Sequence, residues 1–212
     1  MILRRLRIVT AGAMLVLAAG VQAQEQASKP WYVAVGAGGA WYADQGISGS
    51  GPGDLSYDVG YTGNVSIGRY LDDIRVLRLE VEGVYDHADF NNFGGATVGG
   101  SSYNAGLMLN FIYDIHTDSP WIPYLGIGMG YSRVTMDNLS QGGVTAIDGS
   151  DDAFSYQFKG GIAYQFNPSM AVTLQYRYFA TNDLSFSGQP SGTVKTDGTK
   201  VQSAEVGFRF HF

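Results

Sequence analysis

The chain has 212 residues, a formal net charge of −6 and no cysteine, so it is long enough for one domain or two small ones. The negative charge argues against nucleic acid as a partner. The missing cysteines exclude disulfides, thiolate metal sites and cysteine nucleophiles. Charged residues make up only 15% of the chain, whereas 30 glycines, 14 tyrosines and 11 phenylalanines are present. With a mean hydropathy near zero, this composition excludes a disordered chain and a helical membrane protein.

The N-terminal segment has the three parts of a secretory signal. Arg4, Arg5 and Arg7 precede a short apolar stretch at residues 8–19, and small residues up to Ala23 provide a cleavage site. The apolar stretch is shorter than the roughly 20 residues that a spanning helix needs, which disfavours a membrane anchor. We therefore predict a signal peptide over residues 1–23 and one mature domain over residues 24–212. No long apolar run follows, so the exported chain is either a soluble protein or a β-barrel.

Segments of alternating polarity fill the mature chain and predict eight strands. The clearest is residues 76–86, where Leu77, Leu79 and Val81 alternate with charged residues. The predicted strands are residues 31–41, 57–71, 76–86, 103–115, 121–136, 154–166, 170–180 and 200–212.

The connections between these strands alternate between long and short. The long ones are residues 43–56, 87–100, 137–152 and 181–199, and the short ones are residues 72–75, 116–120 and 167–169. Antiparallel neighbours joined in this way form an up-and-down meander, with all long connections at one rim and all short ones at the other. This is the layout of an outer-membrane barrel, and an even strand number places both termini at the periplasmic rim.

One face of each predicted strand is apolar and the other is polar. A soluble barrel would turn the apolar face inward, and periodicity alone leaves both directions open. The export signal, the abundance of aromatic residues and the final Phe212 favour an apolar face that meets lipid. Aromatic residues also gather near the predicted strand ends, as the two interfacial girdles of a membrane barrel require. They are Trp31, Trp41, Tyr57, Tyr85, Tyr103, Trp121, Tyr131, Tyr156, Tyr178 and Phe212.

Several stretches resemble the small outer-membrane β-barrel proteins, the opacity-type, surface-antigen and porin-like group related in architecture to the barrel domain of the OmpA family. The matching stretches are WYVAVGAG at residues 31–38, RLEVEGVY at 78–85, PYLGIGMGY at 123–131, YRYF at 176–179 and VGFRFHF at 206–212. The resemblance implies a Gram-negative outer membrane with its lipid and lipopolysaccharide as surroundings. It also implies that Phe208, Phe210 and Phe212 form the signal read by the barrel-assembly machinery.

Eight charged residues lie on the polar face, which the apolar-out arrangement turns into the lumen. An eight-stranded barrel is only wide enough for side chains to fill it, and buried charges must pair. We therefore predict an ion-pair network that plugs the lumen. The alternative is a gate or a narrow ion path. The predicted members are Arg78, Glu80, Glu82, Asp114, Lys159, Arg177, Glu205 and Arg209.

No other cluster predicts chemistry. Gly126, Gly128 and Gly130 share one strand face and leave room for long side chains of facing strands, without the pattern of a phosphate-binding loop. The three histidines, His87, His116 and His211, fall in different regions. His87 lies near Asp86, Asp89, Ser101 and Ser102, but no nucleophile motif accompanies it. We predict no catalytic residue, metal site or cofactor.

The leading hypothesis for function is a structural or surface-interaction protein of adhesin or antigen type. Its four long loops would contact host or phage surface ligands, because loops carry the specificity in such folds. The alternative is a small porin-like channel. A barrel enzyme that acts on lipid A is the third hypothesis, and the sequence favours no enzyme.

Overall fold

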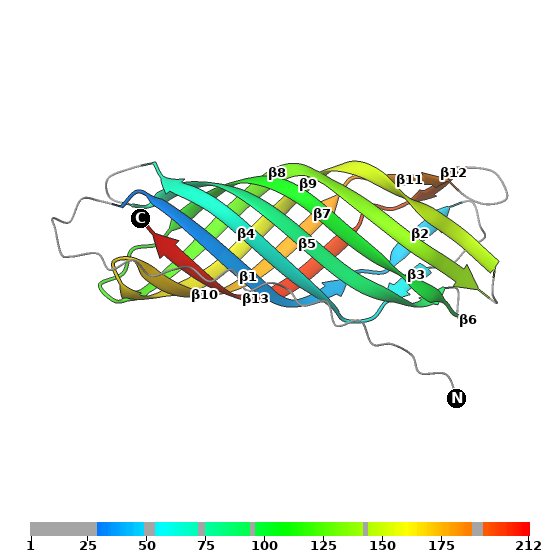
Figure 1. Cartoon of the computed structure of the whole chain (residues 1–212), viewed down its shortest axis with the longest axis horizontal. Helices are drawn as coiled ribbons and strands as arrows, with labels where there is room; N and C mark the ends of the chain where they lie inside the picture. Colours follow the sequence, from blue (N-terminus) through cyan, green and yellow to red (C-terminus); the bar gives the residue numbers. More distant parts are fainter. Residues whose placement is uncertain (1–28, 49–53, 72–74, 94–95, 142–143, 188–192) are drawn as a thin grey trace, which may run out of the picture.

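The computed structural model describes residues 29–48, 54–71, 75–93, 96–141, 144–187 and 193–212. These residues form a closed, antiparallel eight-stranded barrel, and none of them is helical (Figure 1). No helix within these ranges could therefore span a membrane. The wall strands are β1 (Trp31–Tyr42), β4 (Gly60–Tyr70), β5 (Leu77–Phe93), β7 (Gly99–Asp114), β8 (Trp121–Gln141), β9 (Val144–Asn167), β10 (Met170–Thr181) and β13 (Lys200–His211).

Each wall strand pairs with the next one along the chain, and the last strand returns to the first. β13 pairs with β1 in a register that sets Val206 opposite Ala37, and β1 pairs with β4 on its other side. Closure leaves no unpaired strand edge in the wall, which a barrel in lipid requires because no water is present to bond free backbone groups. The predicted eight-stranded up-and-down barrel is confirmed.

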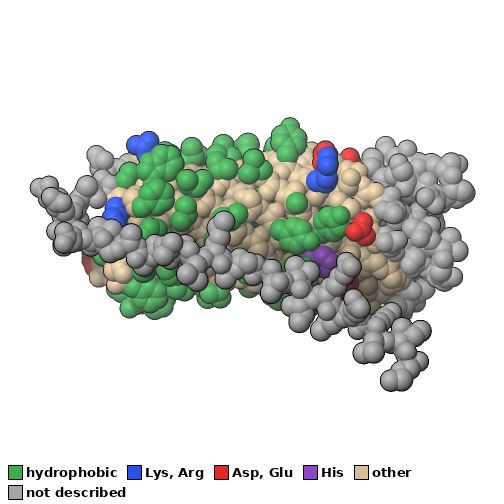
Figure 2. Space-filling view, viewed as in Figure 1, with side chains coloured by type: hydrophobic (Ala, Val, Ile, Leu, Met, Phe, Trp, Pro, Cys, Tyr) green, Lys and Arg blue, Asp and Glu red, His purple; other side chains and the backbone are tan. Residues whose placement is uncertain are grey.

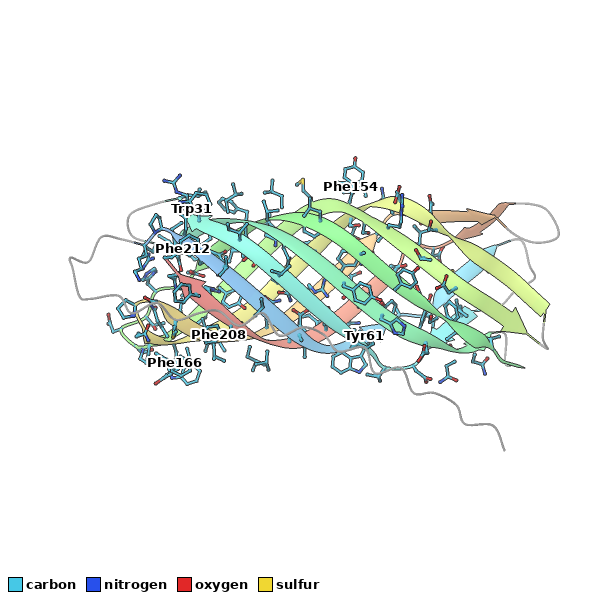
Figure 3. The ribbon with its side chains drawn as sticks, viewed as in Figure 1. Trp31, Tyr61, Phe154, Phe166, Phe208 and Phe212 are labelled. Atoms are coloured by element: carbon cyan, nitrogen blue, oxygen red, sulfur yellow. The ribbon has the colours of Figure 1, made fainter. Side chains whose placement is uncertain are left out.

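The apolar face of every wall strand points outward. Val65, Leu125 and Val206 each leave about 60% of their surface exposed, and the apolar side chains cover the middle of the molecule in a broad band (Figure 2). Aromatic residues occur at both margins of the band. Trp31, Phe166 and Phe212 lie at one end, and Tyr61 lies toward the other (Figure 3). Tyr57 was predicted for a margin but is instead partly buried against Tyr42 and Phe90.

The ends of β4, β7 and β9 and the starts of β5, β8 and β10 lie at one end of the barrel, which we call the turn end. The start of β1 and the C-terminal residue lie at the same end (Figure 1). The opposite end, which we call the hairpin end, differs from the sequence prediction. Two of the four expected long connections, residues 87–100 and 137–152, are mostly strand.

The strands at the hairpin end continue well past the predicted limits. β5 runs on to Phe93, and β8 and β9 form a hairpin that reaches Gln141 and Val144. Asp89, expected in a loop, pairs in the β5–β7 ladder with Ser101, which precedes the next predicted strand. Their polar side chains resemble loop composition, but the cross-strand backbone hydrogen bonds continue the ladder past the apolar band.

The other two long connections also contain short strands. These are β2 (Gln45–Ser48), β3 (Asp54–Tyr57), β11 (Leu184–Ser187) and β12 (Thr193–Thr196). A further short strand, β6 (Ala96–Thr97), lies in the connection after β5 and pairs with the end of that strand. β12 pairs with β2, β2 with β3, and β3 with β5, so the segments at the hairpin end form a connected sheet. The wall strand predicted to begin at residue 57 begins at Gly60 instead, as β4. Tyr57 is the last residue of the short strand β3.

Candidate functional site: the charged lumen

Strand β5 supplies the largest share of charged groups to the lumen. Its side chains alternate between the two faces of the wall, so Arg78, Glu80, Glu82 and Asp86 all point inward. Each of them is at most 5% exposed. The charges that the other strands contribute fall into three groups along the barrel, which we describe from the turn end to the hairpin end.

The group at the turn end is centred on Arg78. Its Nη2 donates a hydrogen bond to Asp114 Oδ1 at 2.7 Å, and its Nη1 donates to the Tyr32 hydroxyl at 2.9 Å. The Tyr32 hydroxyl donates in turn to Glu80 Oε2 at 2.8 Å, and the Tyr70 hydroxyl donates to Asp114 Oδ2 at 3.1 Å. A chain of charge-assisted hydrogen bonds therefore links strands β1, β4, β5 and β7.

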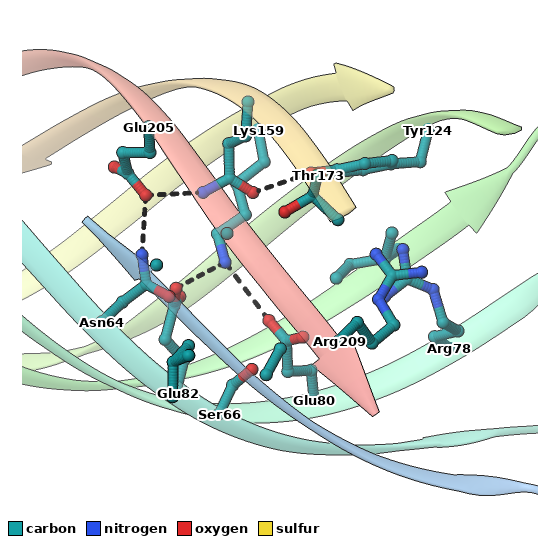
Figure 4. Close-up of a pocket in the computed structure, with 16 residues that line it drawn as sticks. Asn64, Ser66, Arg78, Glu80, Glu82, Tyr124, Lys159, Thr173, Glu205 and Arg209 are labelled. Carbon is teal, nitrogen blue, oxygen red and sulfur yellow. Dashed lines mark hydrogen bonds and ion pairs between the residues drawn. The ribbon is translucent and has the colours of Figure 1, made fainter. Parts of the chain in front are cut away.

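Lys159 holds the middle group together. Its Nζ lies 2.6 Å from Glu82 Oε1 and 3.2 Å from Glu80 Oε1 (Figure 4). The amide nitrogen of Asn110 donates to both carboxylates, at 3.0 and 2.8 Å, and the amide nitrogen of Gln157 donates to Glu82 at 2.7 Å. These amides supply the additional donors that two adjacent buried carboxylates need.

Gly128 makes room for this middle group. A Cβ at its position would lie 2.0 Å from Asn110 Oδ1 and 3.0 Å from Gln157 Cγ. The space beside Gly128 is thus filled by long side chains of the two adjacent strands, whereas the sequence predicted side chains of facing strands.

The third group, toward the hairpin end, is centred on Arg177 of β10, which is fully buried. Its Nη2 donates to Asp86 Oδ1 at 2.5 Å and to Thr62 Oγ1 at 2.6 Å, and its Nε donates to Glu205 Oε1 at 2.8 Å. Asp86 was not among the eight residues expected in the network. The alternation through residues 78, 80 and 82 extends to it and could have identified it.

The eighth expected residue, Arg209, forms no ion pair within the described part of the chain. It is 4% exposed, and its guanidinium carbon lies 5.3 Å from the ring centre of Tyr32 and 5.5 Å from that of Tyr124. The structure thus brings the other seven expected residues into ion pairs and leaves Arg209 stacked against aromatic rings.

A small cavity remains between the turn-end and middle groups. Its volume is about 30 Å³, and Arg209, Arg78 and Lys159 are among the residues in its wall (Figure 4). A single water needs roughly 10–15 Å³ by the same measure, so the space holds one or two waters rather than a continuous water column.

Apolar side chains pack beside the charged groups and fill the lumen at the hairpin end. Near the turn end, Ile112, Tyr124, Ala163 and Ala171 form one buried cluster. Beside the Arg177 group lies a second, formed by Ala40, Val84, Met108, Phe179 and Val201. The third, which we call the hairpin-end core, consists of Leu55, Phe90, Val98, Val134, Met136, Ala153 and Leu184.

The residues considered for a hydrolase site do not assemble into one. Asp86 points into the lumen toward Arg177, whereas the ring of His87 stacks on Tyr61 with centroids 4.9 Å apart. None of the described hydrogen bonds joins His87 to Asp89 or Ser101. Across the described residues, no three His, Asp or Glu side chains are placed to hold a metal ion.

An exposed ion pair lies on the outer surface at the margin of the apolar band. Arg133 Nε and Nη2 donate to the two carboxylate oxygens of Asp152, both at 2.7 Å, and each side chain is 62% exposed. The hydrogen bond lowers the pKa of the Asp152 carboxyl and raises that of Arg133. Charged side chains of both signs appear at this margin in Figure 2.

Two further predicted features have different outcomes. The signal peptide with its cleavage site at Ala23 lies outside the described residues. The aromatic residues of the last strand are described. Phe208 and Phe212 are 40% and 50% exposed on the outer face, and the Phe212 N–H donates to the Trp31 carbonyl at 2.9 Å.

Comparison with known proteins identifies the family. The sequence profile of the outer membrane protein beta-barrel domain matches residues 10–212. An outer membrane protein of Gluconacetobacter diazotrophicus is 30% identical over 161 residues, which cover 67% of this chain and 42% of that protein. Major surface antigen 4 of Anaplasma marginale is 33% identical over 112 residues, which cover 50% of this chain and 36% of the antigen. The chain spans less than half the length of either relative.

Solved structures with the same fold are small outer-membrane proteins. OprG from Pseudomonas aeruginosa aligns with a TM-score of 0.61 at 16% identity, covering 86% of this chain and 97% of that one. Neisserial surface protein A aligns with a TM-score of 0.55 at 22% identity, with the same coverage of 86% and 97%. These likenesses concern the fold alone. Together with the match of the family profile, they show that the chain belongs to the outer membrane protein beta-barrel domain family and is an outer-membrane β-barrel protein.

Proposed function

We propose that this protein is a non-conducting outer-membrane barrel that acts at the cell surface through its folded hairpin end, as an adhesin- or antigen-like component. The observation that carries the proposal is the hairpin-end core. Leu55 and Leu184 come from the short strands of two connections and are fully buried against Val134 and Met136 of β8. The connections therefore pack over the barrel mouth with an apolar core of their own.

The interior of the barrel supports the non-conducting part of the proposal. Arg177, Lys159 and Arg78 each bind carboxylates that come from other strands, and the remaining cavity of about 30 Å³ holds one or two waters. An ion that passed through would have to separate several buried ion pairs and displace the apolar clusters, and breaking one buried pair costs about 3–5 kcal/mol.

The hairpin end supports the surface part of the proposal. Beyond Arg133 and Asp152, β8 and β9 continue as a paired hairpin, and β5 and β7 continue beside them. A preformed sheet loses less conformational entropy on binding than a loose loop, so it suits contact with a host, phage or lipopolysaccharide ligand. We take the four segments at this end, rather than four unstructured loops, as the contact surface.

The proposal includes an orientation and an assembly route. The turn end, with both ends of the described barrel, faces the periplasm, and the hairpin end faces outward. Residues 1–23 direct export and are cleaved after Ala23, and the barrel-assembly machinery recognises Phe208, Phe210 and Phe212. An epitope tag inserted between residues 142 and 143 should be accessible to antibody on intact cells. The same tag between residues 117 and 118 should become accessible only after the outer membrane is permeabilised.

Planar-bilayer conductance of the purified, refolded protein is the experiment that tests the function. We expect no discrete channel openings from the wild-type protein. Regular openings, altered in size or frequency by Arg177→Ala, would contradict the proposal and favour the porin-like alternative. Release of fatty acid from lipopolysaccharide by the purified protein, lost in His87→Ala, would contradict the non-enzymatic role.

A further inference from the structure

Arg209 and Arg78 bring two positive charges against the same pair of aromatic rings. The Arg78 guanidinium carbon lies 5.2 Å from the Tyr32 ring centre and 5.4 Å from that of Tyr124. The corresponding distances for Arg209 are 5.3 and 5.5 Å. Asp114 neutralises Arg78 at 2.7 Å, whereas Arg209 has no carboxylate within ion-pair distance in the described chain. Among the described residues, the two guanidinium groups therefore have one carboxylate, that of Asp114, within ion-pair distance.

The carboxylates in the wall of the cavity are already occupied by other donors. Glu80 accepts hydrogen bonds from Tyr32, Asn110 and Lys159. Both oxygens of Glu82 accept hydrogen bonds as well, from Lys159 on one and from two amides on the other. Glu205 Oε1 accepts from Arg177, and its Oε2 accepts from Asn64 and Gln175. Each of these oxygens accepts at least one hydrogen bond, and none of the described bonds comes from Arg209.

Unused hydrogen-bond donors accumulate around Arg209. It lines the cavity, and its buried Nε has no partner. The buried Nε of Arg78 has none either. His211 is 3% exposed, and neither of its ring nitrogens has a partner, so at least one imidazole N–H is unused; its ring lies 5.7 Å from that of Tyr32. Arg75 adds a further positive charge, stacked 4.7 Å from the Tyr70 ring centre. Buried N–H groups without a described hydrogen-bond acceptor therefore gather at the turn end of the lumen.

We propose that the cavity between Arg78 and Arg209 binds a small inorganic anion of the halide class. A buried guanidinium without a counter-ion costs several kcal/mol, and charge-assisted hydrogen bonds to an anion remove that cost. The volume of about 30 Å³ is larger than the roughly 10–15 Å³ that one water needs and suits a monatomic ion. An organic phosphate is too large for it. The site does not depend on what the hairpin end contacts.

Two measurements test the anion site, and the first is crystallographic. Crystals of the wild-type protein grown in sodium bromide should show an anomalous bromine peak in the cavity, within hydrogen-bond distance of Arg209. Ordered water at that position, with no anomalous signal at saturating bromide, would overturn the proposal. This measurement does not require any variant to fold.

The second measurement is thermal unfolding of the refolded protein in detergent micelles, with chloride exchanged for gluconate at constant ionic strength. Saturating chloride should raise the melting temperature of the wild-type protein by about 3 °C, because a ligand of the folded state stabilises it. Arg209→Met should abolish the rise, whereas Arg209→Lys should keep part of it. Arg133→Met, which removes an exposed arginine on the outer surface, should keep all of it. Equal chloride responses in the wild type and Arg209→Met would overturn the proposal.

Discussion

Arg177 and Asp86 join two strands that are not neighbours in the barrel wall. Arg177 lies on β10 and Asp86 on β5, and Nη2 of the arginine meets Oδ1 of the aspartate at 2.5 Å with both side chains fully buried. Because Arg177 also contacts Glu205 on β13, one guanidinium connects three strands across the lumen. A barrel held only by backbone pairing between adjacent strands would have no such cross-lumen connection.

Arg177→Met should destabilise the barrel strongly, because it leaves Asp86 and Glu205 as buried carboxylates without their counter-ion. Removing one partner of a buried ion pair costs about 3–5 kcal/mol. Urea unfolding of the refolded variant in micelles, followed by tryptophan fluorescence, measures the change. The matched control is Arg133→Met, which removes the exposed partner of Asp152 and should lower the unfolding midpoint far less, because an exposed ion pair contributes at most about 1 kcal/mol. Similar midpoints for the two variants would contradict a stabilising role for the network.

The inward direction of these charges was predictable, but their partners were not. Arg78, Glu80 and Glu82 alternate with Leu79 and Val81, and that period of two fixes the face on which each lies. Which charges meet depends on the tilt and stagger of strands distant in sequence, and no local pattern encodes them. The missing counter-ion of Arg209 therefore could not be predicted from the sequence.

The membrane-spanning parts of the strands were predicted better than their ends. Within the apolar band, lipid on one face and the lumen on the other force strict alternation. Beyond Arg133 both faces meet water or other protein segments, so residues such as Asp89 and Ser101 keep the strand pairing without the apolar signal. The buried Leu55 and Leu184 lie in segments that resembled loops, and their burial depends on contacts between distant connections.

Gly128→Ala should destabilise the barrel through overpacking in the middle group. The new Cβ would lie 2.0 Å from Asn110 Oδ1, and Asn110 is held in place by its bonds to Glu80 and Glu82. We expect a loss of about 1–3 kcal/mol, the usual cost of inserting a methyl group into a packed interior. Urea unfolding measures it.

The control for this substitution is Gly160→Ala on β9. Its Cβ would meet the Leu125 side chain at 3.5 Å, an ordinary contact distance. This variant should unfold at the wild-type urea concentration. Equal losses in the two variants would mean that the effect comes from replacing glycine in a strand rather than from the space around Gly128.

The carboxyl group of Asp152 should titrate below the ordinary aspartate pKa of about 3.9, because Arg133 donates two hydrogen bonds to its charged form. The stabilisation from this pair is present above the ordinary pKa and is lost as the pH falls through the lowered one. Carbon-detected NMR of the refolded protein, with aspartate labelled at the carboxyl carbon, gives the midpoint. Arg133→Gln should return the midpoint to the ordinary value, and high salt should move it in the same direction. An unchanged midpoint in Arg133→Gln would contradict this assignment.

Deletion of Phe212 should impair assembly in the cell more than it impairs the stability of the folded barrel. The Phe212 ring is half exposed on the outer face, and its described backbone contact is one hydrogen bond to Trp31. The net loss from one such bond is about 1 kcal/mol, so the purified variant should refold in detergent and keep its heat-modifiable mobility on gels. In cells, the amount of folded protein in the outer membrane should fall severalfold if the assembly machinery recognises this residue.

Phe166→Ala provides the comparison that separates recognition from loss of lipid contact. Phe166 is another outward aromatic residue at the turn end, 58% exposed and located on β9 rather than on the last strand. The Phe166→Ala variant loses a comparable apolar surface but keeps Phe208, Phe210 and Phe212. The amount of this variant in the outer membrane should therefore stay near that of the wild-type protein. If both variants accumulate to the same reduced level, lipid contact at the turn end explains the effect and recognition of Phe212 does not.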